Sequence, residues 1–167
     1  MSLDRNLTNK KTGDPIKSSD WNALASETVR LSQSIGFRML QATLWENLTT
    51  ANGWTPVINQ EVPFDTPTSL LLIGHGHGSS ETAGVHLRVA IRVNGTVLGP
   101  PDSNGPVGAA FLSFSNSVNN WVPITAIGGC PVPQGPSRVE LVIRREGPVG
   151  TVRLNNPTLW LIQLGAS

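Results

Sequence analysis

Two histidines set among single glycines are the residues of this 167-residue chain best placed for chemistry. They lie in the run Gly-His-Gly-His-Gly at positions 74–78. In a β-strand, residues two positions apart point to the same side, so His75 and His77 are expected to extend the face of Leu71 and Ile73. The three glycines line the opposite side, where the missing side chains let another part of the chain approach closely.

Two neutral imidazoles on one side of a strand suggest a metal site. If three copies of this strand met on a threefold axis, His75 and His77 from each copy would supply six nitrogen ligands, which suits a transition metal such as iron, nickel or zinc. Two other interpretations stay open. The rings can stack around the axis without metal, or they can be hydrogen-bonded or solvated at the end of an ordinary strand.

No catalytic motif accompanies the histidines. The chain has no serine-nucleophile elbow, no zinc-protease helix motif and no phosphate-binding glycine loop. The lone Cys130 rules out a disulfide within the chain and a cysteine-rich metal site, and we expect a packed thiol rather than a nucleophile. The sequence therefore predicts a protein that is not an enzyme. A glycosidase stays open, because two carboxylates distant in sequence can meet in the fold; the candidates are Glu46, Glu61, Asp65, Glu81, Asp102, Glu140 and Glu146.

Short β-strands dominate the rest of the chain. Gly (17) and Pro (13) are frequent, and charged residues make up only 14%, against about 25% in typical soluble domains. The segment 85–93 alternates, with Val85, Leu87, Val89, Ile91 and Val93 on one face, and Asn94-Gly95 then favours a type I′ turn. We expect 99–108 to be an exposed loop, 150–155 and 158–164 to be separate strands, and four arginines to form an outer solvated face: Arg88, Arg92, Arg144 and Arg145. Eight to ten such strands indicate a β-sandwich or barrel.

The N-terminal region has a different pattern. Residues 1–17 are polar and predict an extended arm or linker, and residues 18–36 predict a helix that ends at Gly36. Its apolar positions repeat at spacings of three and four, which is the seam of a short coiled coil at an oligomer axis; they are Trp21, Leu24, Thr28, Leu31 and Ile35. An amphipathic helix packed on its own domain is the alternative. Residues 37–167 would then form the head.

Two resemblances extend this interpretation. The segment PIKSSDWNALASETVRL (15–31) resembles an N-terminal helix of bacteriophage tail fibres, which implies a trimeric stalk. Residues 38–164 resemble the complement-type and tumour-necrosis-factor-like jelly roll, on the runs GGCPVPQGPSRVELVIRR and NNPTLWLIQLG. Gly135-Pro136 stands where that family has Gly-Asp, and tyrosine is absent. Both resemblances imply a homotrimer with a ligand-binding head. Phage fibre tips also hold iron on a trimer axis with a Gly-x-His-x-His run, which His75 and His77 match by position.

Taken together, the sequence predicts a mainly β protein with a jelly-roll β-sandwich head and a short helical, trimeric stalk. Its expected role is a non-enzymatic fibre head or adhesin that binds a cell-surface protein or glycan through loops such as 99–108 and 116–120. A lectin-like carbohydrate module is the alternative, and the glycosidase is the second. The tryptophans fit either a core or interface or a sugar-stacking platform; they are Trp45, Trp54, Trp121 and Trp160.

Charge and hydropathy limit the partners and the location expected for the protein. A formal net charge of +1 gives no electrostatic reason to expect nucleic acid or an anionic membrane as partner. No apolar run reaches the length of a membrane-inserted helix, and residues 1–14 lack the apolar core of a signal peptide. We therefore expect a phage virion or another extracellular fibre.

Overall fold

The computed structural model describes residues 36–41, 46–50, 53–98, 101–102, 105–106, 110–114, 120–147 and 149–166, together with Asn22 and Ser26. Those two residues have helical backbone and exposed side chains, in keeping with their place off the predicted seam. The predicted arm and the five seam residues lie outside the described residues, so the division into arm, stalk and head stays a prediction. No helix among the described residues is long and apolar enough to cross a membrane.

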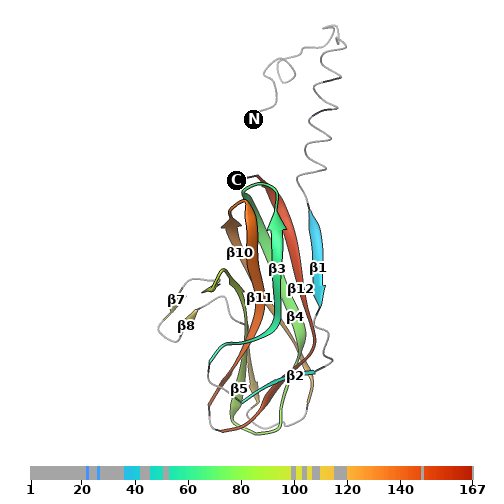
Figure 1. Ribbon diagram of the computed structural model, residues 1–167. Helices are drawn as coiled ribbons and strands as arrows, with labels where there is room; N and C mark the ends of the chain where they lie inside the picture. Colours follow the sequence, from blue (N-terminus) through green and yellow to red (C-terminus); the bar gives the residue numbers. More distant parts are fainter. Residues whose placement is uncertain are drawn as a thin grey trace, which may run out of the picture.

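Two antiparallel sheets packed face to face make up the head (Figure 1), which confirms the predicted jelly-roll β-sandwich. Sheet A has the order β1-β12-β4-β10, with β2 also paired to β12. Its strands are β1 (Phe37–Gln41), β2 (Glu46–Thr49), β4 (Thr68–Ser80), β10 (Val122–Val132) and β12 (Val152–Ala166). Sheet B has the order β3-β11-β5-β6, with β9 also paired to β5. Its strands are β3 (Thr55–Phe64), β5 (Val85–Val93), β6 (Thr96–Val97), β9 (Ala110–Phe114) and β11 (Gly135–Glu146).

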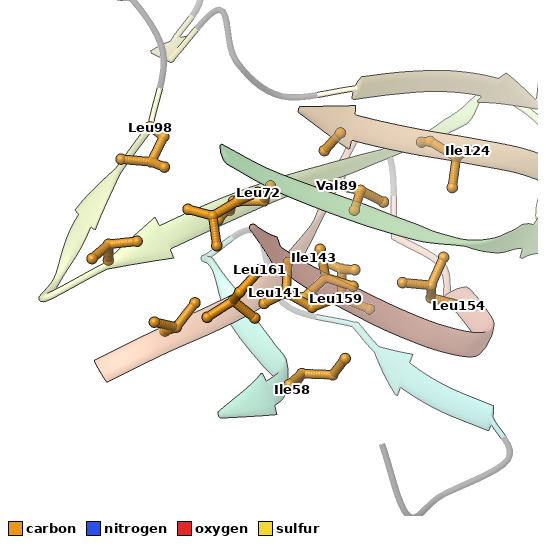
Figure 2. Packing of buried hydrophobic residues seen from close by; sticks show 14 of the residues in the cluster. Ile58, Leu72, Val89, Leu98, Ile124, Leu141, Ile143, Leu154, Leu159 and Leu161 are labelled. Carbon is orange, nitrogen blue, oxygen red and sulfur yellow. The ribbon is translucent and has the colours of Figure 1, made fainter. Parts of the chain in front are cut away.

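The core lies between the sheets and follows the alternation seen in the sequence (Figure 2). All five apolar residues of β5 that were expected on one face are buried. Their partners across the core, on sheet A, include Leu72, Ile124, Leu154 and Leu159. Apolar burial of this kind is the main source of folding free energy, at about 25 cal/mol per Å² removed from water.

Glycines of β4 make room for that core. A β-carbon added to Gly74 would collide with the Leu141 side chain, and one added to Gly76 would lie 2.7 Å from Leu154 Cδ1. Both glycines therefore face inward, and they lie opposite the histidines, as the alternation predicted. The side chains of β11 and β12 occupy the space that the missing β-carbons leave.

Two details differ from the prediction. Residues 152–166 form one strand, not two, because a β-bulge absorbs the extra residue: Asn155 pairs with His77 and Thr158 with His75. Asn156 permits this with a left-handed φ of 48°, a conformation that asparagine tolerates. The expected loop 99–108 contains a short ladder of β7 (Pro101–Asp102) with β8 (Gly105–Pro106).

The chain enters the sandwich at one end, and two of its turns lie at the other. The chain enters beside the C-terminal strand, where the Gln163 N–H donates to the Gly36 carbonyl at 2.8 Å. The β4–β5 and β11–β12 turns lie at the opposite end (Figure 1), since Ser80 pairs with Val152 and Glu146 with His86. We call this opposite end the distal end.

Candidate functional face on sheet A

Apolar side chains form a continuous band across the outer side of sheet A. In one row Phe37 pairs with Ile162 and Ile162 with Leu71. In the next row Met39 pairs with Trp160, Trp160 with Ile73, and Ile73 with Ile127. The apolar band is defined by these side chains: Phe37, Met39, Leu71, Ile73, Ile127, Trp160 and Ile162.

Much of this band is open to solvent. The exposed fractions are 64% for Phe37, 56% for Met39 and 60% for Ile127, and the other members are half-buried. No member carries a charge. Monomeric soluble proteins rarely expose contiguous apolar patches beyond a few hundred Å², so such a surface usually marks an interaction site.

The two histidines lie on this same outer side, next to the apolar band. His75 stands between Thr125 of β10 and Thr158 of β12, and His77 stands between Pro123 and Asn155. Both rings are half-buried. Their centroids are 5.3 Å apart in an edge-to-face arrangement, and His75 Nδ1 is 3.0 Å from Thr125 Oγ1. The expectation that both histidines extend the face of Leu71 and Ile73 is confirmed.

This geometry places two imidazoles that could serve as metal ligands on one side of the chain. In the tautomer whose Nδ1–H donates to Thr125 Oγ1, Nε2 of His75 is left as the nitrogen that could coordinate a metal. Among the described residues, no group of three or more His, Cys, Asp or Glu side chains is placed to hold a metal ion. The described residues offer the pair no third ligand, so a metal at this place would need ligands from elsewhere, such as further copies of the chain.

The outer side of sheet B is charged instead. Arg92 donates to both carboxylate oxygens of Glu140, at 2.6 and 2.9 Å. Glu146 pairs with Arg88, at 2.8 Å, and with Arg144. Burial opposes ionisation of Glu146, but the hydrogen bonds from the two arginines outweigh it and hold its pKa below the usual range. Both carboxylates are thus engaged in ion pairs with arginines.

One arginine differs from the expectation. Arg145 is buried and points inward, where Nε donates to the Thr50 carbonyl at 2.8 Å and a second nitrogen donates to the Gly147 carbonyl at 3.1 Å. The predicted solvated face therefore does not include Arg145. Its long side chain ties two chain segments near the distal end to the sandwich.

The structure also shows where three of the four candidate tryptophans and the cysteine lie. Trp54 lies under the Arg144 guanidinium at 4.9 Å, Trp160 belongs to the apolar band, and Trp121 is 41% exposed. None of these three is in the buried core, so for them the interface and the sugar-stacking interpretations remain; Trp45 lies outside the described residues. Cys130 is half-buried against the core, and desolvation raises the pKa of its thiol, as expected of a packed residue.

Comparison with known proteins shows the fold. No protein family matches the sequence, and no curated protein matches it. Among solved structures, 80% of the chain matches dimeric latent PorU from Porphyromonas gingivalis (TM-score 0.53, 11% identity), and 77% matches the VP2 subviral particle of infectious bursal disease virus (0.50, 13%). The chain spans only 13% and 33% of these two proteins.

The Eiger TNF of S. frugiperda is similar over most of both chains. The match covers 80% of this chain and 93% of that one, with a TM-score of 0.50 and 8% identity. At such identities the likeness concerns the fold alone. It agrees with the jelly-roll head expected from residues 38–164, whereas the tail-fibre resemblance of residues 15–31 falls outside the described residues.

Proposed function

We propose that this protein is the non-enzymatic binding head of a homotrimeric fibre or adhesin, and that the apolar band is the contact between its subunits. The exposed band on sheet A is the observation that carries the proposal. Burying it against a second copy removes apolar surface from water with no charge to desolvate, which is the combination that favours stable association.

The distribution of charge supports the same role for sheet A. The outer side of sheet B carries three arginines and two glutamates in ion pairs, whereas the apolar band carries none. The outer side of sheet B is thus suited to contact with solvent, and the apolar band on sheet A is suited to contact with another protein surface. The resemblance of the head to trimeric jelly rolls, together with the seam predicted for residues 21–35, favours three copies over two.

The proposed role follows from this assembly. A rigid sandwich with its entry strand at one end and exposed turns at the other presents those turns to a surface partner. The partner is a cell-surface protein or a glycan, and a phage virion or extracellular fibre is the setting. Three copies raise the effective concentration of binding sites, so weak single contacts suffice for attachment.

Light scattering coupled to size exclusion tests the assembly. The full chain should give about three times 17.8 kDa, with the mass unchanged on dilution through the micromolar range. A mass of one chain throughout that range would remove the basis of the proposed function, since the apolar band would then face water.

A metal held by His75 and His77 is the second part of the proposal. Three chains with the band in contact would bring six imidazoles together, and iron, nickel or zinc fits that ligand set. Such a metal would bridge the three subunits and stabilise the trimer by mass action. Elemental analysis of untagged protein incubated with each metal salt tests this, with His75→Ala/His77→Ala as control. Less than about a tenth of an ion per trimer would contradict it.

A further inference from the structure

An exposed tryptophan stands at the distal end of sheet A, beyond the histidines. Trp121 precedes β10, whose first pair joins Val122 to Gly78. Continuing that register by one residue places Trp121 opposite Ser79, and Ser79 pairs on its other side with Arg153 of β12. Strand alternation puts all three on the outer side of the sheet. Trp121 is 41% exposed, so part of the residue is open to a ligand.

An ion pair lies near this tryptophan in the register, on the far side of β4. Arg153 forms an ion pair with Glu81, in the turn after β4. The side chain of Glu81 is 47% exposed and that of Arg153 is 23% exposed. The pair therefore fixes the two side chains relative to each other while the carboxylate keeps an open side toward solvent. Asn120, next to Trp121, is also exposed.

Two buried oxygens at this place have no partner among the described residues. Ser79 Oγ lies in a residue that is 0% exposed, and Asn155 Oδ1 occupies the neighbouring outer position on β12. Buried polar atoms in proteins are nearly always hydrogen-bonded. A ligand hydroxyl that enters between the indole and the guanidinium, once either side chain rotates, would supply the missing bond.

This combination of groups matches the chemistry of a sugar. The C–H face of a pyranose ring packs on an indole, an apolar surface of the same size and flatness. Vicinal hydroxyls hydrogen-bond to a planar carboxylate or guanidinium, and Glu81 accepts where a hydroxyl donates. An acidic sugar fits less well, because its negative charge would face the carboxylate of Glu81.

We propose that Trp121, Glu81, Arg153 and Ser79 form a binding site for a neutral hexose unit of a glycan at the distal end of the head. This rests on the proposed binding function and names its ligand class. The site lies one row beyond His77 on the outer side of sheet A, so this inference requires the subunit contact to end at the histidines. One site per chain then gives three in a trimer, and their combined avidity compensates for a shallow surface.

Binding to a glycan array, followed by titration calorimetry with the best neutral oligosaccharide, tests the site on the full chain. We expect neutral glycans ending in glucose, galactose or mannose to bind, and Trp121→Ala to weaken the affinity by about tenfold or more. Glu81→Gln should weaken it as well, whereas Val149→Ala, a 90% exposed position at the same end, should leave it unchanged. Thermal melting of each variant separates a lost site from a lost fold.

Three results would overturn this inference: no neutral glycan bound by a correctly assembled trimer, undiminished affinity in a folded Trp121→Ala variant, or binding of sialylated or sulfated glycans alone. None of these results would argue against the proposed trimer. A monomeric mass would refute the assembly whatever the sugar result, so the two failures are distinguishable.

Discussion

Replacing Ile127 by aspartate is the sharpest perturbation of the proposed subunit contact. Ile127 is 60% exposed in the single chain, so the change removes little from the monomer's own core. Complete burial of an isoleucine contributes about 1.5–3 kcal/mol, and three-fifths of that is about 1–2 kcal/mol per chain, or about 3–5 kcal/mol per trimer. At about 1.4 kcal/mol per factor of ten, trimer formation should weaken by about 10²- to 10⁴-fold. Desolvation of the carboxylate adds to this.

Sedimentation equilibrium over a range of protein concentrations measures the effect. Ile127→Asp should dissociate at concentrations where the natural chain is still trimeric, with unchanged secondary structure by circular dichroism. Val149→Asp is the matched control: Val149 is 90% exposed, in the turn after β11 and away from the band, and its replacement should leave assembly as it was. Equal dissociation of Ile127→Asp and the natural chain would refute the assignment of the interface.

Four further outcomes are expected. Gly76→Ala should lower the free energy of unfolding by about 1–3 kcal/mol, because the added carbon meets Leu154, whereas Gly53→Ala, which meets nothing within 4 Å, should not; chemical denaturation measures both. Because the pKa of Glu146 is lowered in the folded state, its ion pairs stabilise the protein above the unfolded pKa of about 4.3 and cease to do so as pH falls through the folded pKa. Glu146→Gln should therefore cost up to about 1 kcal/mol at pH 7 and nothing in acid, and equal losses at pH 7 and in acid would contradict this. His75→Ala/His77→Ala should abolish metal uptake, because it removes all of the proposed ligands; unchanged uptake by the variant would exclude these ligands. Deleting residues 1–35 should lower trimer stability and leave the head folded by circular dichroism; undiminished stability would show that the segment is not a stalk.

Local patterns in the sequence predicted much of the head. Alternation in 85–93 identified the buried side of β5, and the same period of two placed His75 and His77 on the side of Leu71 and Ile73. The structure shows this to be the outer side of β4. The same alternation also predicts an inward side chain for Arg145, because Arg145 lies two and four residues after the buried Ile143 and Leu141. Assigning Arg145 to the outer face followed its charge and overlooked its position in the strand. The positive φ values of Asn94 (48°) and Gly95 (85°) agree with the predicted type I′ turn.

Features that depend on pairing between distant segments were not predictable. The apolar band joins Met39 of β1, Ile73 of β4, Ile127 of β10 and Trp160 of β12, and nothing local to any one strand fixes their common register. The bulge at Asn156 was not predictable for a related reason. An Asn-Asn-Pro run usually ends a strand, but here the partner strand β4 continues past it and keeps β12 in the ladder. The neighbours of the histidines, Thr125 and Asn155, likewise follow only from the register.

Oxidation of Met39 by dilute peroxide, followed by peptide mass spectrometry, tests the central claim most directly. Met39 lies in the apolar band and is 56% exposed in the single chain, and methionine oxidation follows exposure of the sulfur. In the natural protein we predict that Met39 is oxidised far more slowly than in the chain unfolded by urea, and that Ile127→Asp abolishes this protection. Oxidation of Met39 in the natural protein as fast as in the unfolded chain would show that the band faces water and would contradict the proposed trimer.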